Sequence, residues 1–160
     1  MPHEIERKFL VVGDEWRASC RACQRVKQAY LAKSDLAIVR VRIVDEHRAF
    51  VTIKSAGLGV SRAEFEYPIP CDHAHELVRL RTGLIIEKRR HLVHIGDAQW
   101  EIDEFEGHHG GLVLAELELS DPAAPFRRPN WLGKEVTGDP RYYNAFLAMG
   151  EPQFAGRTAA

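Results

Sequence analysis

Glu4-Ile5-Glu6-Arg7-Lys8, near the N-terminus, is the stretch of sequence from which the fold can be inferred. In a β-strand successive side chains point to opposite faces, so Glu4, Glu6 and Lys8 share one face. Charged side chains are almost never buried unless they are paired or bind a metal. This face therefore lies in water or lines a wet, charged cavity.

Pairs of polar residues two positions apart recur along the chain, each within a segment of β-forming residues. The pairs are Arg40/Arg42, Thr52/Lys54, Glu64/Glu66, Lys88/Arg90, Glu101/Asp103 and Glu116/Glu118. One such strand is usually the solvent face of an antiparallel sheet. A whole series, with both charge signs in blocks, favours a closed barrel with a polar, charged lumen.

The bulk composition fits one soluble domain. The chain has 160 residues, 45% of them hydrophobic and 28% charged, with a net charge of −1. That balance gives no basic field for nucleic acid. No apolar run approaches the roughly 20 residues of a membrane helix, and the N-terminal residues do not resemble a signal segment. We expect a cytoplasmic protein with no membrane partner, one domain over residues 1–150 and a flexible tail over 151–160.

Strands dominate the expected elements. Alternation and turn signals predict them at residues 3–11, 26–33, 37–44, 48–55, 62–69, 84–90, 91–96, 99–105 and 112–119. Helices are predicted over 15–25, over 72–81 with Asp72 as cap, and over 141–149 after Asp139-Pro140, with a short element after Ser120. The fold class is α+β, mainly β: an antiparallel barrel with flanking helices.

A polar lumen turns the apolar side chains outward, where they must be covered. These residues are Ile5, Phe9, Val39, Val41, Ile53, Phe65, Ile102 and Leu117. The helices can cover part of this surface, and a homodimer can cover the rest. Cys20-x-x-Cys23 falls in the predicted helix over 15–25, without the second ligand pair of a zinc site. We therefore interpret both as ordinary thiols, and the lone Cys71 as a packing residue.

The inward residues suggest a specific chemistry. Arg and Lys in this number would repel one another unless an anion lies among them. The carboxylates outnumber what the bases need, and clusters of carboxylates bind Mg²⁺ or Mn²⁺. A polyanion held by bases on one side and by a carboxylate-bound metal on the other is the arrangement for phosphoryl transfer. The alternative, a lumen of internal ion pairs with no ligand, is costly to desolvate.

The ordered set of motifs resembles the CYTH family, the triphosphate tunnel metalloenzymes. Glu4-x-Glu6-x-Lys8 is similar to the family signature, and the other strand pairs follow in the family's order. Two further motifs that match are Gln28-x-Tyr30-Leu31 and the closing Gly133-Lys134-Glu135-Val136-Thr137 with Tyr142-Tyr143-Asn144. The resemblance covers nearly the whole chain. It implies an eight-stranded antiparallel tunnel that binds a triphosphate.

The resemblance also implies roles for individual residues. Metal ligands are expected at Glu4, Glu6, Asp103, Glu116 and Glu118. Phosphate-binding bases are expected at Lys8, Arg40, Arg42, Lys54, Lys88 and Arg90. Catalytic roles fall to Lys8, Tyr30, Glu116 and Asp103, with Tyr30 able to pair with Lys8, and supporting acidic roles to Glu64, Glu66 and Glu101. For Lys134, Glu135 and Arg141, a purely structural role explains the residue as well as a role in the site does.

We expect the reaction to be the hydrolysis of inorganic tripolyphosphate to pyrophosphate and phosphate with Mg²⁺ or Mn²⁺. The motifs do not separate it from a thiamine or nucleoside triphosphatase or from a class IV-type adenylate cyclase. A non-catalytic polyphosphate-binding module would need the bases but not the carboxylates. A lipocalin-like barrel for an apolar ligand conflicts with the charged lumen.

Overall fold

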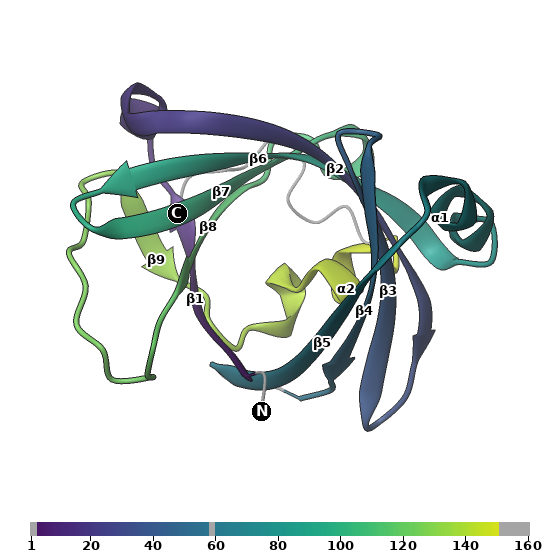
Figure 1. Cartoon of the computed structure of the whole chain (residues 1–160). Coiled ribbons are helices and arrows are strands. Elements are labelled where there is room, and N and C mark those ends of the chain that lie inside the picture. The colour runs from purple at the N-terminus through teal and green to yellow at the C-terminus, as the bar shows by residue number, and fades with distance from the viewer. Residues whose placement is uncertain (1–2, 58–59, 151–160) are drawn as a thin grey trace.

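The chain folds into a closed barrel of eight antiparallel strands, to which a ninth short strand is added. The computed structural model describes residues 3–57 and 60–150, and the side chain of Glu4 lies outside this description. The strands are β1 (His3–Val11), β2 (Cys20–Lys33), β3 (Ala37–Val44), β4 (Arg48–Ser55), β5 (Ser61–Ile69), β6 (Thr82–Ile95), β7 (Ala98–Phe105), β8 (Val113–Glu118) and β9 (Leu132–Glu135). Their order is β5-β4-β3-β2-β6-β7-β8-β1-β9, and pairing of β5 with β1 closes the ring (Figure 1). The predicted barrel is confirmed.

The register of the strands brings the charged pairs together across the barrel wall. Lys8 of β1 lies opposite Glu116 of β8, and Glu6 lies opposite Glu118. The same holds further round the wall, where Lys54 faces Glu64 and Arg90 faces Asp103. Because side chains alternate along each strand, this one register turns all of these residues inward together.

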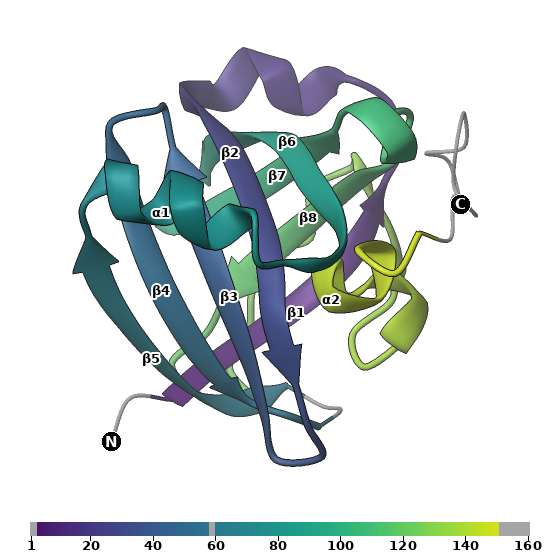
Figure 2. The same ribbon diagram turned by 90° about the vertical axis from the view of Figure 1, so that its right-hand side faces the viewer.

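Helix α1 (Cys71–Val78) covers part of the outer surface, over β2, β3 and β4 (Figure 2). It packs Ala74 and Val78 against Ala29, Val41 and Ile43. Burial of these apolar groups, at roughly 25 cal/mol per Å², is what holds so short a helix in place.

A second outer cluster covers the opposite part of the wall. The 3₁₀-helix η1 (Glu15–Ser19) places Trp16 there, and the segment before β9 adds Phe126 and Trp131. They pack with Phe9, Val93, Trp100, Ile102 and Leu117, which are buried. Of the residues expected to face outward, Ile53 and Phe65 each stay 38% exposed, so the chain itself leaves them partly open. The homodimer stays a prediction.

The C-terminal segment enters the barrel rather than flanking it. The 3₁₀-helix η3 (Pro140–Tyr142) leads into helix α2 (Asn144–Leu147), which lies inside the ring of strands (Figure 1). Tyr142 and Leu147 pack with inward residues of the wall, such as Leu10, Ile86 and Leu114. One end of the lumen is therefore filled by an apolar plug, and the polar cavity occupies the remainder.

Several predicted boundaries were wrong. The helix over 15–25 is only η1, because the chain from Cys20 onward pairs with β6 and is strand. The strands over 84–90 and 91–96 are one strand, β6. Tertiary pairing overrode local propensity in both cases.

Smaller differences concern the termini of elements. The helix α1 begins at Cys71 after Pro70, one residue before the expected cap, and the residues after Ser120 form turns. The predicted helix over 141–149 divides into η3 and α2, although Asp139 caps the start as expected by accepting a hydrogen bond from the Arg141 backbone N–H at 3.1 Å. The strand β9 was not predicted. The single domain over 1–150 stays a prediction, and the tail over 151–160 lies outside the described residues.

Candidate active site

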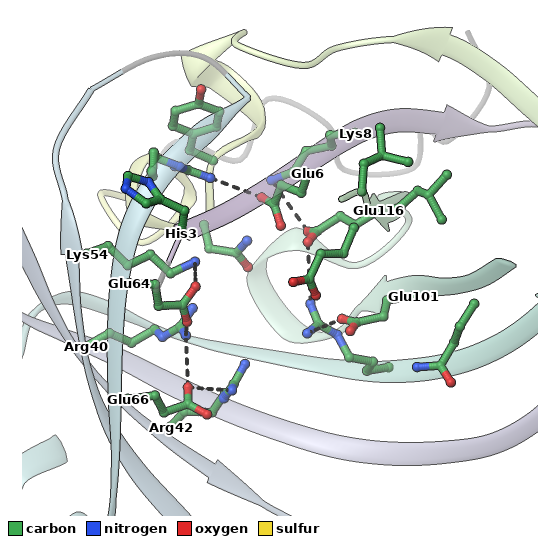
Figure 3. Close-up of a pocket in the computed structure, with 18 of the residues that line it drawn as sticks. His3, Glu6, Lys8, Arg40, Arg42, Lys54, Glu64, Glu66, Glu101 and Glu116 are labelled. Atoms are coloured by element: carbon green, nitrogen blue, oxygen red, sulfur yellow. Dashed lines mark hydrogen bonds and ion pairs between the residues drawn. The ribbon is translucent and has the colours of Figure 1, made fainter. Parts of the chain in front are cut away.

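The lumen holds a cavity of about 970 Å³. Its wall includes the bases Lys8, Arg40, Arg42, Lys54, Arg62, Lys88 and Arg90 and the carboxylates Glu6, Glu64, Glu66, Glu101, Glu116 and Glu118. Figure 3 shows the labelled side chains converging on one space from different strands. The structure thus brings most of the predicted site residues into a single cavity.

Three bases on β3 and β4 share two carboxylates on β5. Lys54 Nζ lies 3.4 Å from Glu64 Oε2, and Arg42 Nη2 lies 2.8 Å from Glu66 Oε2. Arg40 Nη2 lies 3.7 Å from Glu64 and 3.8 Å from Glu66. The predicted supporting acids are therefore counter-ions that fix the bases while their remaining donors face the cavity.

Thr52 links two members of this group. Its Oγ1 accepts a hydrogen bond from Arg40 Nη2 at 3.2 Å and donates one to Glu66 at 2.9 Å. Burial and the nearby positive charges of Arg40 and Arg90 lower the pKa of Arg42. A bound anion would relieve this repulsion.

Asp103 ties together the two bases of β6. Its carboxylate accepts hydrogen bonds from Lys88 Nζ at 2.7 Å and from Arg90 Nε and Nη2, each at 2.8 Å. Burial raises its pKa, but the charges of Arg90 and Lys88 outweigh this and hold the pKa below its usual value. Asp103 is fully buried behind bases that line the cavity. Its contacts fit a residue that positions Lys88 and Arg90.

The charge on Lys88 is finely balanced. Burial lowers its pKa to about 8, although Asp103 pulls in the opposite direction. Nζ also donates a hydrogen bond to Asn144 Oδ1 at 3.0 Å. The plug helix α2 thereby contacts a base of the cavity wall.

Glu101 completes the surroundings of Arg90. It forms an ion pair with Arg90 Nη1 at the cavity wall. Burial raises the pKa of Glu101, while Arg90 opposes the rise.

Lys8 and Glu116 form the buried pair at the β1–β8 seam. Lys8 Nζ lies 3.5 Å from Glu116 Oε1 and donates a hydrogen bond to the Tyr142 carbonyl oxygen at 3.2 Å. Burial raises the pKa of Glu116, but Lys8 and Arg90 hold it well below its usual value. Tyr30 lines the same cavity as Lys8, and its hydroxyl accepts a hydrogen bond from the Gln28 side-chain nitrogen at 3.4 Å; its pairing with Lys8 stays a prediction.

Carboxylates of the type that binds Mg²⁺ or Mn²⁺ gather where β1 meets β8. Glu6 and Glu118 are opposite each other, and Glu116 is two residues from Glu118 on the same face. No three His, Cys, Asp or Glu side chains in the described part of the chain are assembled as a metal site. Glu116 is turned toward Lys8 and Arg90, and Glu6 toward Arg62. The donor chemistry fits a hard cation, and these oxygens would exchange basic partners for it.

Arg62 is the base that sequence reasoning missed. Its Nη2 donates a hydrogen bond to Glu6 Oε1 at 3.0 Å, and its guanidinium lies 5.0 Å from the centre of the Tyr143 ring. The alternation Arg62-x-Glu64-x-Glu66 was the signal that could have identified it. Tyr143 and Asn144, which belong to the closing motif Tyr142-Tyr143-Asn144, also line the cavity, although no site role was predicted for them.

The three uncertain residues of the C-terminal motif lie away from the cavity wall. Glu135 accepts hydrogen bonds from Arg7, on the outward face of β1, and from Thr137. Arg141 pairs with Asp139, and Lys134 is exposed. These contacts are structural.

Comparison with known proteins identifies the class to which this tunnel belongs. The CYTH domain family matches residues 2–143. The chain therefore belongs to the CYTH domain family, as the motifs predicted.

Particular relatives are similar over almost their full length. A protein named inorganic triphosphatase from Acetivibrio thermocellus is 41% identical over 148 residues, which are 92% of this chain and 94% of the relative. Another of that name from Nitrosomonas europaea is 38% identical over 156 residues, covering 93% of this chain and 99% of the relative. A crystal structure of an inorganic triphosphatase superposes with a TM-score of 0.68 at 34% identity, covering 95% of this chain and 98% of the other.

Proposed function

We propose that this protein is a divalent-metal-dependent triphosphatase that cleaves inorganic tripolyphosphate to pyrophosphate and phosphate. The observation that carries the proposal is that one cavity is lined both by the bases Arg40, Arg42, Lys54, Lys88 and Arg90 and by the carboxylates of β1 and β8. The relatives named inorganic triphosphatase support the same reaction.

The bases bind and orient the chain of phosphates. Arg40 and Arg42 offer planar pairs of donors to phosphate oxygens, while Lys54 and Lys88 act as point charges. Their counter-ions Glu64, Glu66 and Asp103 hold them in place before the substrate arrives, so little reorganisation is needed as charge develops on the phosphoryl oxygens.

The carboxylates act on the other side of the substrate. Glu6, Glu116 and Glu118, with Glu4, would hold Mg²⁺ or Mn²⁺. When bound, the metal would neutralise charge on the phosphates and activate water. Because the pKa of Glu116 is well below its usual value, this group stays ionised and can orient a water molecule by accepting its hydrogen bond. Asp103, with both oxygens engaged by bases, positions Lys88 and Arg90.

The proposal also includes a cytoplasmic location for the protein. No helix in residues 3–57 and 60–150 has the length and apolar character to span a membrane. Cys20, Cys23 and Cys71 are free thiols, which supports a cytoplasmic location because disulfides are rare there.

Phosphate release tests the proposal. Tripolyphosphate, ATP and thiamine triphosphate are compared with Mg²⁺ and with Mn²⁺, with Glu6→Ala as the blank. We expect tripolyphosphate to be turned over fastest, and Glu6→Ala to lose at least about 100-fold, the scale of losing one transition-state contact.

The other outcomes identify the alternatives. Cyclic AMP and pyrophosphate from ATP would indicate a cyclase. Tight binding of tripolyphosphate without release of phosphate would indicate a binding module.

A further inference from the structure

The outer face of the barrel carries a second cluster of reactive side chains, contributed by three adjacent strands. Cys20 begins β2, His91 belongs to β6 and Glu104 to β7. Arg90 lines the cavity, so the next side chain along β6, that of His91, points away from it. The cluster is therefore separated from the tunnel by the barrel wall.

A bulge explains why Cys20 is part of this cluster. Residues three apart on a regular strand face opposite sides, so Cys20 and Cys23 would be separated by the sheet. The register shifts between Cys20 and Ala22, and the extra residue turns Cys20 to the outer side. There Cys20 packs beside the cluster that contains Trp16 and Val93.

The three side chains form a continuous chain of contacts. Cys20 Sγ lies 3.6 Å from His91 Nδ1, and His91 Nε2 lies 2.6 Å from Glu104 Oε1. Glu104 is itself fixed by two hydrogen bonds from Arg17, at 3.0 and 2.7 Å. The Trp16 ring packs edge-on against the imidazole, with 4.8 Å between ring centres. The imidazole is thus held on both sides.

The carboxylate decides which nitrogen of His91 carries the proton. Glu104 can only accept, so Nε2 donates and the lone pair of Nδ1 faces the thiol. Cys20 Sγ also lies 3.4 Å from the Ala22 carbonyl oxygen, which can accept a hydrogen bond but cannot take the proton. A nucleophile beside a base that a third group orients is the arrangement of an activated thiol.

The other two cysteines provide internal references. Cys23 is the most exposed of the three, and accessibility alone would make it the first to react. Burial and the neighbouring Cys20 raise the pKa of Cys23, which favours its neutral thiol. Cys71 is half-buried at the start of α1.

We propose that Cys20 is a peroxide-reactive thiol whose proton is taken by His91, with Glu104 as the positioning residue. The Cys20 sulfur attacks one oxygen of a hydroperoxide, a sulfur–oxygen bond forms and the oxygen–oxygen bond breaks. The sulfur is oxidised to a sulfenic acid, and the peroxide is reduced to water or an alcohol that leaves with the proton from His91. The site is independent of the proposed triphosphatase function.

Site-resolved oxidation of the native protein tests this proposal. The reduced protein is treated with hydrogen peroxide, sulfenic acids are trapped with dimedone, and the rate at each cysteine is measured by mass spectrometry. We expect Cys20 to react at least about tenfold faster than Cys23 and Cys71, a smaller factor than the roughly 100-fold or more typical of a positioned base. In denaturant, the three rates should converge.

Two variants separate activation from accessibility. His91→Gln should slow oxidation of Cys20 by about tenfold or more while the rate at Cys23 in the same molecules stays unchanged. Glu104→Gln should slow Cys20 in the same selective way. A variant that merely loosened the fold would instead accelerate all three thiols, and thermal unfolding monitors this directly.

Two results would overturn the proposal. One is oxidation of Cys23 or Cys71 as fast as Cys20 in the native protein. The other is an unchanged Cys20 rate in His91→Gln. Should that variant fail to fold, Glu104→Gln decides on the same criterion.

Discussion

Asp103 pairs with two buried bases, Lys88 and Arg90, through one carboxylate, and we expect the arrangement of both bases to depend on it. Its side chain is fully buried, and that of Lys88 is 2% exposed. In Asp103→Asn buried Lys88 would lose its ion pair, while Arg90 would keep those with Glu101 and Glu116. We expect the free energy of unfolding, measured by denaturant titration, to fall by about 3–5 kcal/mol.

Glu101→Gln is the matched control for Asp103→Asn, because Glu101 also pairs with Arg90 but is one-third exposed. We expect Glu101→Gln to lower the free energy of unfolding by no more than about 1 kcal/mol. Tripolyphosphate should stabilise Asp103→Asn against unfolding more than it stabilises the wild type, since the ligand replaces the missing negative charge. Equal losses in the two variants would contradict the role given to Asp103.

The pKa of Lys88 predicts how the binding of tripolyphosphate depends on pH. Burial lowers its pKa to about 8, so the free protein loses this charge as the pH rises through that value. Tripolyphosphate favours the charged form, and its affinity without metal should fall by up to about tenfold per pH unit above pH 8. Calorimetry from pH 6.5 to 9.5 measures this.

Lys88→Met separates the contribution of Lys88 to this pH dependence from that of the ionisation of tripolyphosphate itself. The variant should show the smaller pH dependence that belongs to the ligand alone. The same pKa has a consequence for stability. Because the folded-state pKa lies below the unfolded value of 10.5, protonated Lys88 costs stability below pH 8, and the cost disappears between there and 10.5. Identical pH profiles of tripolyphosphate affinity for Lys88→Met and the wild type would contradict the pKa given to Lys88.

At the scale of elements, helix α2 is held in the lumen by a close approach at Gly83. The Leu84 N–H donates a hydrogen bond to the Ala148 carbonyl oxygen at 2.6 Å. A Cβ at Gly83 would lie 2.2 Å from that oxygen, and its φ is +71°. Gly83→Ala should therefore cost about 2 kcal/mol or more and raise KM for the triphosphate, because Asn144 of α2 lines the cavity.

Gly96→Ala provides the comparison. Gly96 has a φ of +60°, but a Cβ there would meet nothing within 4 Å. The strain alone should cost about 1 kcal/mol and leave KM unchanged. If denaturation and kinetics showed the same effects for both variants, α2 would not depend on the contact at Gly83.

The seam between β1 and β5 has the shortest pairing in the barrel wall among residues 3–57 and 60–150. There His3, Glu4 and Ile5 pair with β5 and the Glu6 N–H donates a hydrogen bond to the Val60 carbonyl oxygen at 2.9 Å, whereas β3 pairs with β4 along its whole length. Amides of residues 61–63 should therefore exchange with solvent faster than those of β3. Tripolyphosphate should slow them, because Arg62 lines the cavity. Equal protection of residues 61–63 and of β3, measured by hydrogen exchange, would contradict this.

Residues at alternating strand positions were those that the sequence could place. A period of two specifies the face of Glu6, Arg40 or Lys88 without knowledge of the partner strand, and the barrel follows from many such faces. Asp103 was placed on the right strand face, but its burial behind two bases depends on packing that no local pattern encodes. The same limit applies to α2, whose entry into the lumen depends on a contact between residues 83 and 148.

The whole molecule is a tunnel closed at one end by an apolar plug, with bases and carboxylates facing each other in the remainder. We propose that the carboxylates where β1 meets β8 bind the metal for triphosphate hydrolysis. Glu118 tests this most cleanly. It lines the cavity, and its side chain has no hydrogen bond or ion pair with any other residue the structure describes.

The decisive measurement is therefore tripolyphosphate turnover by Glu118→Gln as a function of Mg²⁺ concentration. We expect turnover to fall by at least about 100-fold and to require more Mg²⁺, while thermal stability and metal-free affinity for tripolyphosphate stay unchanged. Turnover equal to that of the wild type at every Mg²⁺ concentration would contradict this proposal.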